Sequence, residues 1–268
     1  MKGPNKTARG VALGLGYAFL YVPILSLMVF SFNDSAMVTT WSGFSLRWYG
    51  QLMQDDALLS AAWLSFRIAV LTATAAAVLG TWAGYVLARM RRFRGLTLYV
   101  GMLSAPLVIP EVVLGISLLL MFVELRGALG FPAENGMFTI WIGHVTLCMA
   151  FVSVVIQSRV RDLDRSLEEA ALDLGATPAR VFFSITLPLI APAVVSGWLL
   201  AFTLSLDDVV IASFLSGPGS TTLPMEVFSR VRLGLKPEVN ALATLFILAV
   251  GTCVIVANRM QWRKEARK

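Results

Sequence analysis

The chain has 268 residues, of which 57% are hydrophobic and 14% are charged, and its mean hydropathy is +0.75. Soluble globular domains have about 45–50% apolar and about 25% charged residues, so this composition excludes a water-soluble fold. The formal net charge is +6. The Lys and Arg residues nevertheless lie between apolar segments and not along one solvated face, which argues against a nucleic-acid partner.

Six apolar segments are long enough to cross a bilayer, for which a helix needs about 20 residues. We therefore expect an all-α integral membrane protein with a single transmembrane domain over residues 1–268. The expected spans are 11–32, 64–88, 97–123, 137–157, 189–213 and 239–258. The first span follows basic residues, as a signal peptide would, but its apolar stretch exceeds the about 7–15 residues typical of one. We interpret it as uncleaved.

The basic residues indicate the orientation, because positive loops stay on the cytoplasmic side of the membrane. The larger set, placed in the cytoplasm, is Lys2, Lys6, Arg9, Arg89, Arg91, Arg92, Arg94, Arg159, Arg161, Arg165, Arg180, Arg259, Arg263, Lys264, Arg267 and Lys268, and the remainder is Arg47, Arg67, Arg126, Arg230, Arg232 and Lys236. This division predicts a multi-pass protein of the bacterial inner membrane with both termini in the cytoplasm. The loop 214–238, which this orientation places outside the cytoplasm, has three positive residues and therefore does not fully fit the rule.

Several residues within or beside the spans have more than one interpretation. Pro106 and Pro110 predict a kink in the third span, which is either an ordinary kink or part of a water-lined path. Cys148, Cys253 and His144 are flanked by apolar residues and are interpreted as packed helix residues, with no disulfide or metal site expected. The aromatic residues Trp41, Trp48 and Tyr49 of the 33–60 loop are expected to anchor at the membrane interface.

The charged loop 158–188 has the pattern of two short helices at the membrane surface. Good helix formers run from Leu163 to Leu174, and Gly175 then provides a terminator that tolerates positive φ. Thr177 and Pro178 provide an N-cap and a first-turn proline for a second helix. Such a helix–Gly–helix elbow suits docking into a groove of another protein. An amphipathic loop that only lies on the membrane surface is the alternative.

A motif in this loop resembles the EAA signature of bacterial ABC importer permeases. It consists of Glu169-Ala170-Ala171, Gly175, Ile185 and Leu187-Pro188 at the spacing of the family. The stretches RWYGQL, APLVIPEVVLGISLL and GWLLAFTLSLDDVVIASFLSGPG are also similar to the permeases of spermidine/putrescine importers, most closely the putrescine type. The resemblance implies a type I importer permease fold in which the loop couples the permease to an ATPase. The coupling residues would be Glu168, Glu169, Ala170, Ala171, Gly175, Ile185, Leu187 and Pro188, with Glu168 and Glu169 facing basic residues of the partner.

The resemblance also implies the partners of the chain. These are two copies of a cytoplasmic ABC ATPase, a second homologous permease, a periplasmic polyamine-binding protein and membrane lipid. The sequence has no GxxxxGK[ST] motif, and the glycines at Gly217 and Gly219 have no lysine beside them, so they are interpreted as a turn. We therefore expect no catalytic residues and no cofactor in this chain, with ATP and Mg²⁺ on the ATPase.

Three acidic residues, Glu111, Asp207 and Asp208, lie in or near apolar segments. A carboxylate at the centre of a membrane costs about 2.5–3.5 kcal/mol, which favours a functional role such as contact with a cationic substrate. Asp208 is the preferred candidate, because it lies on a stripe of small or polar residues formed with Gly197, Ala201, Ser205 and Ala212. Asp207 lies about 100° around the helix.

Structural roles for these acids remain open. Glu111 follows Pro110 and could stabilise the start of a helix, and either aspartate could pair with Arg67 or Arg230. The sequence thus predicts the permease subunit of an ABC importer for a polyamine, with putrescine favoured over spermidine. The alternatives are an importer permease for another small solute and an ion-coupled cation transporter, for which no inverted repeat is visible. A membrane enzyme has no nucleophile–base or metal-ligand pattern to support it.

Overall fold

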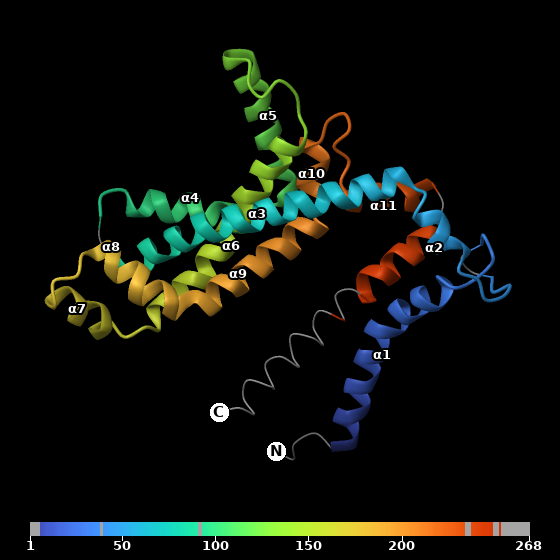
Figure 1. Ribbon diagram of the computed structural model, residues 1–268, viewed down its shortest axis with the longest axis horizontal. Coiled ribbons are helices and arrows are strands. Elements are labelled where there is room, and N and C mark those ends of the chain that lie inside the picture. Colours follow the sequence, from blue (N-terminus) through green and yellow to red (C-terminus); the bar gives the residue numbers. More distant parts are fainter. Residues whose placement is uncertain (1–5, 38–39, 91–92, 234–236, 249–251, 253–268) are drawn as a thin grey trace. The chain divides into compact units, whose positions relative to one another are not determined.

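The structure is a computed structural model that describes residues 6–37, 40–90, 93–233, 237–248 and 252 (Figure 1). These residues are helical apart from connecting loops and one isolated β-bridge between Asn33 and Phe44. The helices are α1 (Lys6–Phe30), α2 (Arg47–Leu52), α3 (Asp56–Arg89), α4 (Leu96–Val108), α5 (Glu111–Leu129), α6 (Met137–Arg161), α7 (Ser166–Asp173), α8 (Pro178–Val181), the π-helix η1 (Phe182–Thr186), α9 (Leu187–Asp207), α10 (Val210–Leu215), α11 (Leu223–Leu233) and an apolar helix at Pro237–Leu248. The chain forms two compact units, residues 60–226 and residues 1–59 with 227–268.

Five helical segments are long and apolar enough to cross a membrane, in agreement with an all-helical membrane protein. They are Arg9–Phe30, Asp56–Arg89, Glu111–Leu129, Met137–Arg161 and Pro178–Asp207. The sixth expected span, 239–258, is represented by the shorter helix Pro237–Leu248. Cys253 and most of the rest of that span lie outside the described residues, as do Lys2, Arg91, Arg92, Lys236 and the basic residues from Arg259 onward. Within the described residues, the helices long enough to cross a membrane thus number five and not six.

Two expected spans are each divided into two helices. The segment 97–123 is interrupted between α4 and α5 at Ile109, whose backbone is extended (φ −73°, ψ 132°) because the following Pro110 disfavours the helical conformation. The segment 189–213 is interrupted between α9 and α10 at Asp208, which is also extended (φ −65°, ψ 127°). The first break was predicted as a kink at proline, whereas no proline or glycine marks the second.

Helix α6 lies at the centre of the unit formed by residues 60–226. One core joins it to α3 and α9 through Ala73, Ala76, Val152, Ile156, Ile190 and Ala201, and a second joins it to α5 and α10 through Leu118, Phe122, Ile140, Ile211 and Leu215. A Cβ on Gly84 would lie 2.5 Å from the backbone oxygen of Ser153, and one on Gly143 would lie 2.5 Å from Leu215 Cδ1. Glycine at these two positions lets α3 and α10 approach α6 closely.

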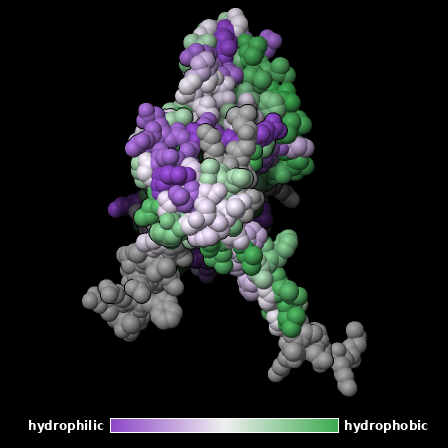
Figure 2. All heavy atoms as spheres, turned by 90° about the vertical axis from the view of Figure 1, so that its right-hand side faces the viewer, coloured by the Kyte–Doolittle hydropathy of each residue, from purple (hydrophilic) through white to green (hydrophobic). Residues whose placement is uncertain are grey.

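Large apolar side chains cover much of the outer surface of the helices. On α5, Val112, Val113, Leu120 and Met121 are all about half exposed. Figure 2 shows hydrophobic atoms along one side of the upper part of the molecule, which includes α5. Exposed apolar surface of this extent is typical of helices covered by lipid or by another membrane subunit.

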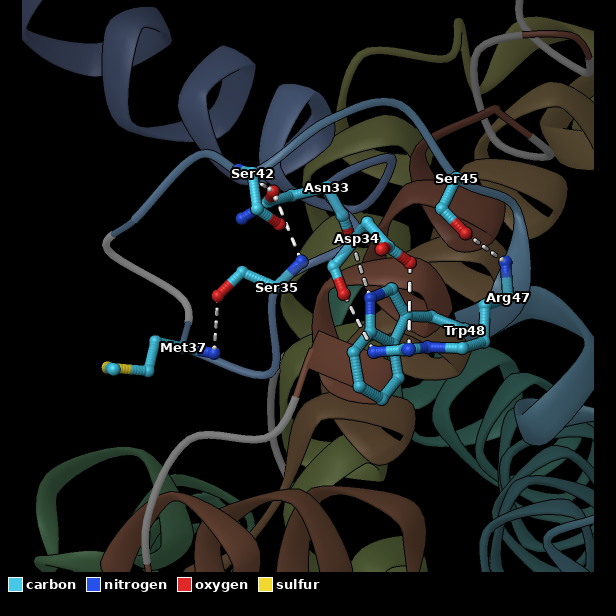
Figure 3. Close-up of polar contacts among 8 residues, drawn as sticks. All are labelled: Asn33, Asp34, Ser35, Met37, Ser42, Ser45, Arg47 and Trp48. Atoms are coloured by element: carbon cyan, nitrogen blue, oxygen red, sulfur yellow. Dashed lines mark hydrogen bonds and ion pairs between the residues drawn. The ribbon is translucent and has the colours of Figure 1, made fainter.

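The loop between α1 and α2 is organised around the buried side chain of Asn33 (Figure 3). Its Nδ2 donates to the Thr40 carbonyl at 2.7 Å, and its Oδ1 accepts from the backbone N–H of Ser42 at 2.9 Å. Its own carbonyl accepts from Trp48 Nε1 at 2.6 Å. Trp48 is 6% exposed, so the expectation that it anchors at the membrane interface is wrong, whereas Trp41 is half exposed. Within the described part of this loop, Asn33 therefore links Thr40, Ser42 and Trp48.

Candidate functional site

The 158–188 loop forms the elbow that the sequence predicts, with α7 and α8 joined by a sharp bend (Figure 1). Gly175 has φ +85°, and its N–H donates to the Leu172 carbonyl at 2.9 Å, while the N–H of Ala176 donates to the Ala171 carbonyl at 3.0 Å. These two bonds form a Schellman motif, which ends a helix with a residue in the left-handed conformation. The first helix starts at Ser166, three residues later than the sequence suggests.

The second helix of the elbow also begins as predicted. Thr177 is extended and its Oγ1 accepts a hydrogen bond from the N–H of Arg180 at 3.4 Å, with Pro178 in the first turn. Fixed φ and a missing N–H make proline suitable there. The local sequence therefore determines both sides of the bend.

The outer face of the elbow has no cover within the described part of the chain. No residue of α7 is buried. Leu167 is 48% exposed and Leu174 is 89% exposed, and Glu169 and Ala170 also face outward. Short amphipathic helices rarely leave leucines in water unless another surface covers them. The elbow thus has the properties of an incomplete interface.

Glu168 is engaged within the chain and not directed outward. Its Oε1 accepts from Thr186 Oγ1 at 2.7 Å, and its Oε2 lies 2.7 Å from Arg89 Nε. The expectation that Glu168 faces a partner does not match this geometry. Its carboxylate instead ties α7 to the C-terminal end of α3 and to η1, so that the elbow is fixed to the membrane-spanning helices. Of the remaining motif residues, Ile185 and Leu187 are half-buried and Pro188 is exposed.

Asp208 lies at the break between α9 and α10, where it is 9% exposed. Its Oδ1 accepts from the N–H of Ala212 at 2.8 Å and lies 3.1 Å from His144 Nε2. The other ring nitrogen of His144, Nδ1, lies 2.7 Å from Ser205 Oγ. An imidazole with hydrogen on Nε2 satisfies both contacts, since it donates to Asp208 and accepts from Ser205. Asp208 therefore caps α10 and holds three helices, α6, α9 and α10, together.

The other two acids are the exposed ones. Asp207 and Glu111 lie next to the two helix breaks, and both are exposed. Helices α5 and α10, which follow the two breaks, pack against each other through Leu118, Phe122, Ile211 and Leu215. Asp208, the residue that the sequence favours for contact with the substrate, is buried, whereas Asp207 is exposed. The small-residue stripe faces the bundle interior, because Gly197, Ala201, Ser205 and Ala212 are all buried.

Neither of the arginines considered as partners for the aspartates takes that role in the structure. Arg230 forms a bidentate pair with Asp55, with Nη1–Oδ2 at 2.5 Å and Nη2–Oδ1 at 3.0 Å, and also contacts Glu238 at 3.4 Å. Arg67 is exposed on α3. The partner that the sequence analysis missed is His144. A polar ring in an apolar span has to be hydrogen-bonded, which is the one signal that pointed to a buried partner.

The remaining sequence motifs have structural roles. Gly217 and Ser220 form a tight turn in which Ser220 Oγ accepts from the Gly217 N–H at 2.7 Å and Gly219 has φ +70°. Within the described residues, no group of three His, Cys, Asp or Glu side chains is arranged to hold a metal ion.

Comparisons with known proteins agree with this architecture. Residues 76–267 match the family described as "Binding-protein-dependent transport system inner membrane component". The chain is 60% identical to the putrescine transport system permease protein PotI of Escherichia coli (strain K12), over 97% of this chain and 92% of that protein. It is 41% identical to the spermidine/putrescine transport system permease protein PotC of the same strain, over 98% and 97% of the two chains.

Solved structures show the same fold at lower identity. A chain of a bacterial ABC transporter involved in the import of the acidic polysaccharide alginate matches with a TM-score of 0.73 and 18% identity, over 97% of this chain and 99% of that one. A chain of the MetNI methionine ABC transporter matches with a TM-score of 0.62 and 14% identity, over 76% and 94%. The chain therefore belongs to the family of binding-protein-dependent transport system inner membrane components, which are multi-pass membrane permeases.

Proposed function

We propose that the chain is the membrane-spanning permease subunit of an ATP-driven importer that moves a polyamine, with putrescine favoured, into the cytoplasm. The observation that carries the proposal is the 60% identity to a putrescine permease over nearly the whole length of both chains. A family match alone leaves the cargo open, since solved relatives of the same fold import an anionic polysaccharide and an amino acid.

The placement of the exposed carboxylates supports a cationic cargo. A diamine has two ammonium groups that lose hydration when they enter a narrow path, and fixed carboxylates compensate for part of that loss. Asp207 and Glu111 are exposed beside two neighbouring helix breaks, and interrupted backbone inside a membrane is tolerated where it is buried in protein or lines a water-filled path. We assign the contact with the ammonium groups to these two residues, and we assign a positioning role to Asp208, Ser205 and His144.

The elbow is proposed as the coupling element. Its uncovered face, with Leu167, Leu174 and Glu169, would dock on a cytoplasmic ATPase. Ala170, Ala171 and Gly175 allow close approach, while Ile185, Leu187 and Pro188 connect the elbow to α9. Glu168 would transmit movement of the ATPase to α3 and η1 through Arg89 and Thr186. ATP and Mg²⁺ would be bound by that partner.

The remaining parts of the proposal concern the assembly. Two copies of the ATPase, a second permease of the same family and a periplasmic polyamine-binding protein would complete the importer. Both termini and the elbow would lie in the cytoplasm, as the uneven division of basic residues suggests. The ordered loop built on Asn33 would then lie on the periplasmic side, where a binding protein approaches.

Uptake of radiolabelled putrescine by the complete importer in proteoliposomes tests the cargo assignment. We expect Asp207→Asn and Glu111→Gln each to lower uptake per assembled complex by about tenfold, which corresponds to about 1.4 kcal/mol of lost stabilisation. Glu124→Gln, which removes an exposed carboxylate elsewhere on α5, serves as the matched control and should transport normally. If the importer carries another solute but not putrescine or spermidine, the polyamine assignment is wrong.

A further inference from the structure

A cavity of about 290 Å³ lies between the C-terminal end of α3 and the junction of α6 with α7. It is lined by Leu87, Ala88, Arg89, Arg161 and Arg165. Three guanidinium groups thus surround one small space, and no acidic residue is among the described residues that line it. The proposed transport path and the outer face of the elbow do not use this cavity.

Arg89 is the buried member of the set, with 10% of its side chain exposed. Its Nε lies 2.7 Å from Glu168 Oε2 in an ion pair, although the N–H does not have the alignment of a hydrogen bond. Its Nη2 is buried and has no hydrogen-bond partner within the described residues. A buried charged donor without an acceptor is costly, so this atom points to a group that the chain itself does not provide.

The other two arginines leave most of their donors available. Arg165 Nη2 makes one long contact, 3.4 Å, to the Ala88 carbonyl, and Arg161 is exposed at the end of α6. Glu168 compensates for only one of the three positive charges. The nearby acids Asp162 and Asp164 are both exposed and do not line the cavity, and Asp164 accepts from the Ser166 N–H at 3.0 Å. The cavity therefore has an excess of positive charge and of N–H donors.

We infer that this cavity binds a phosphate group. Planar guanidinium groups match the oxygens of a phosphate in pairs, and several of them around one site are typical of phosphate recognition. The volume admits a phosphate with a short ester substituent, and the apolar side chains of Leu87 and Ala88 can contact the carbon atoms of such a substituent.

Two sources of the phosphate fit the position of the cavity. Arg89 ends α3 and Arg161 ends α6, and both helices are long enough to span the membrane. The cavity is thus at the level where lipid headgroups lie, and anionic phospholipids are attracted to basic clusters of the cytoplasmic face. Inorganic phosphate of the cytoplasm has the same chemistry. The lipid source rests on the proposed orientation of the chain, whereas phosphate binding itself does not.

The test uses the complete importer in two kinds of nanodisc. In the first arm, discs of phosphatidylcholine with a small fraction of phosphatidylglycerol are analysed by native mass spectrometry for retained phosphatidylglycerol. In the second arm, binding of radiolabelled inorganic phosphate is measured in pure phosphatidylcholine discs. Arg161→Gln and the double variant Arg161→Gln/Arg165→Gln remove donors of the cavity without touching the Arg89–Glu168 pair.

We expect about tenfold weaker binding for Arg161→Gln in the arm that corresponds to the true source, and a further loss in the double variant. Arg159→Gln is the matched control, because Arg159 is exposed on the last turn of α6 and outside the cavity; it should bind as the wild type does. Binding in either arm with this pattern supports the site and identifies the source. An equal loss in Arg159→Gln, or the absence of arginine-dependent binding in both arms, overturns the inference.

Discussion

Asp208 is held by groups from two helices, and its removal should affect folding before it affects transport. Asp208→Ala leaves His144 Nε2 and the Ala212 N–H without an acceptor in a buried place, at a cost of about 1–3 kcal/mol for each. Asp208→Asn retains an oxygen that can accept both bonds. We expect the alanine variant to have a lower membrane yield and a lower melting temperature in detergent than the asparagine variant.

Uptake per assembled complex separates this role from direct contact with the cargo. If Asp208 only positions other residues, the Asp208→Asn complexes that do assemble should still take up putrescine. Normal yield of Asp208→Asn together with complete loss of uptake would contradict our assignment and restore Asp208 as a substrate contact.

Asp55 and Arg230 form a partly buried ion pair that should make stability depend on pH. The hydrogen bonds from Arg230 hold the pKa of the Asp55 carboxyl below its usual range, and the backbone N–H of Leu58 acts in the same direction. A lowered pKa stabilises the fold above the unfolded pKa of about 3.9, and this contribution is lost as the pH falls through the lower folded value. Asp55→Asn should therefore lower the melting temperature at pH 7, and this difference should shrink as the pH falls below about 3.9.

The measurement is a thermal denaturation series of the purified permease from pH 7 down to pH 3. Asp56→Asn is the control, since it changes a neighbouring carboxylate for which no contact to Arg230 is described. If the difference in melting temperature between the wild type and Asp55→Asn stays constant over the whole pH range, the ion pair makes no contribution to stability.

The residues that sequence reasoning placed correctly are those whose environment is local. Thr177 and Gly175 depend on neighbours within five residues, so their roles as cap and terminator follow from the pattern alone. His144 and Asp208 are 64 residues apart, and Arg230 and Asp55 are 175 apart. Such pairs depend on how whole helices pack, which spacing along one helix does not reveal. For the same reason, the spacing along the helix did not reveal that Asp208 is bonded to His144.

Among the elements, the α7–α8 bend gives the clearest prediction. Gly175 has φ +85°, and no atom lies within 4 Å of a Cβ added there. Gly175→Val therefore acts through backbone strain, which costs about 1–2 kcal/mol for a residue in the left-handed region. We expect a loss of about fivefold to thirtyfold in ATPase stimulation by the substrate-loaded binding protein, with the permease still inserted in the membrane.

Gly175→Asn is the matched variant, because asparagine tolerates the left-handed conformation better than valine does. It should retain most of the stimulation. If valine and asparagine variants behave alike and both match the wild type, the shape of the bend does not matter for coupling.

The helix breaks show the limit of prediction at the level of elements. Proline marks the break before α5, and the sequence pattern indicated a kink there. The break before α10 has no such mark, since it depends on a buried Asp208 that competes for the Ala212 N–H and thereby starts a new helix. Glu111, Asp207 and Asp208 at the two breaks are too few to divide the apolar segments, so a count of apolar residues reports one span where the structure has two helices.

Considering the whole chain, the orientation is open to a direct test. We expect single cysteines introduced at 163–180 in a cysteine-free background to be protected from a membrane-impermeant maleimide added to intact cells, because the elbow would be cytoplasmic. Cysteines at exposed positions of 33–60 should be labelled. Both sets of cysteines should react after the cells are permeabilised, which controls for burial. If intact cells label the cysteines at 163–180 and not those at 33–60, the proposed orientation is inverted.

The close contacts of α6 limit which parts of the permease can move during a transport cycle. Gly84 of α3 lies against the α6 backbone at Ser153, and Gly143 of α6 lies against the side chains of Ile211 and Leu215 of α10. Interfaces packed in this way do not slide gradually, since small shifts produce overlaps of atoms. We therefore expect α3, α6 and α10 to move as one rigid body when the elbow is displaced. Helix α9 packs against α6 in the same core, and Asp208 is bonded to both His144 and Ala212, so we expect α9 to move together with this unit.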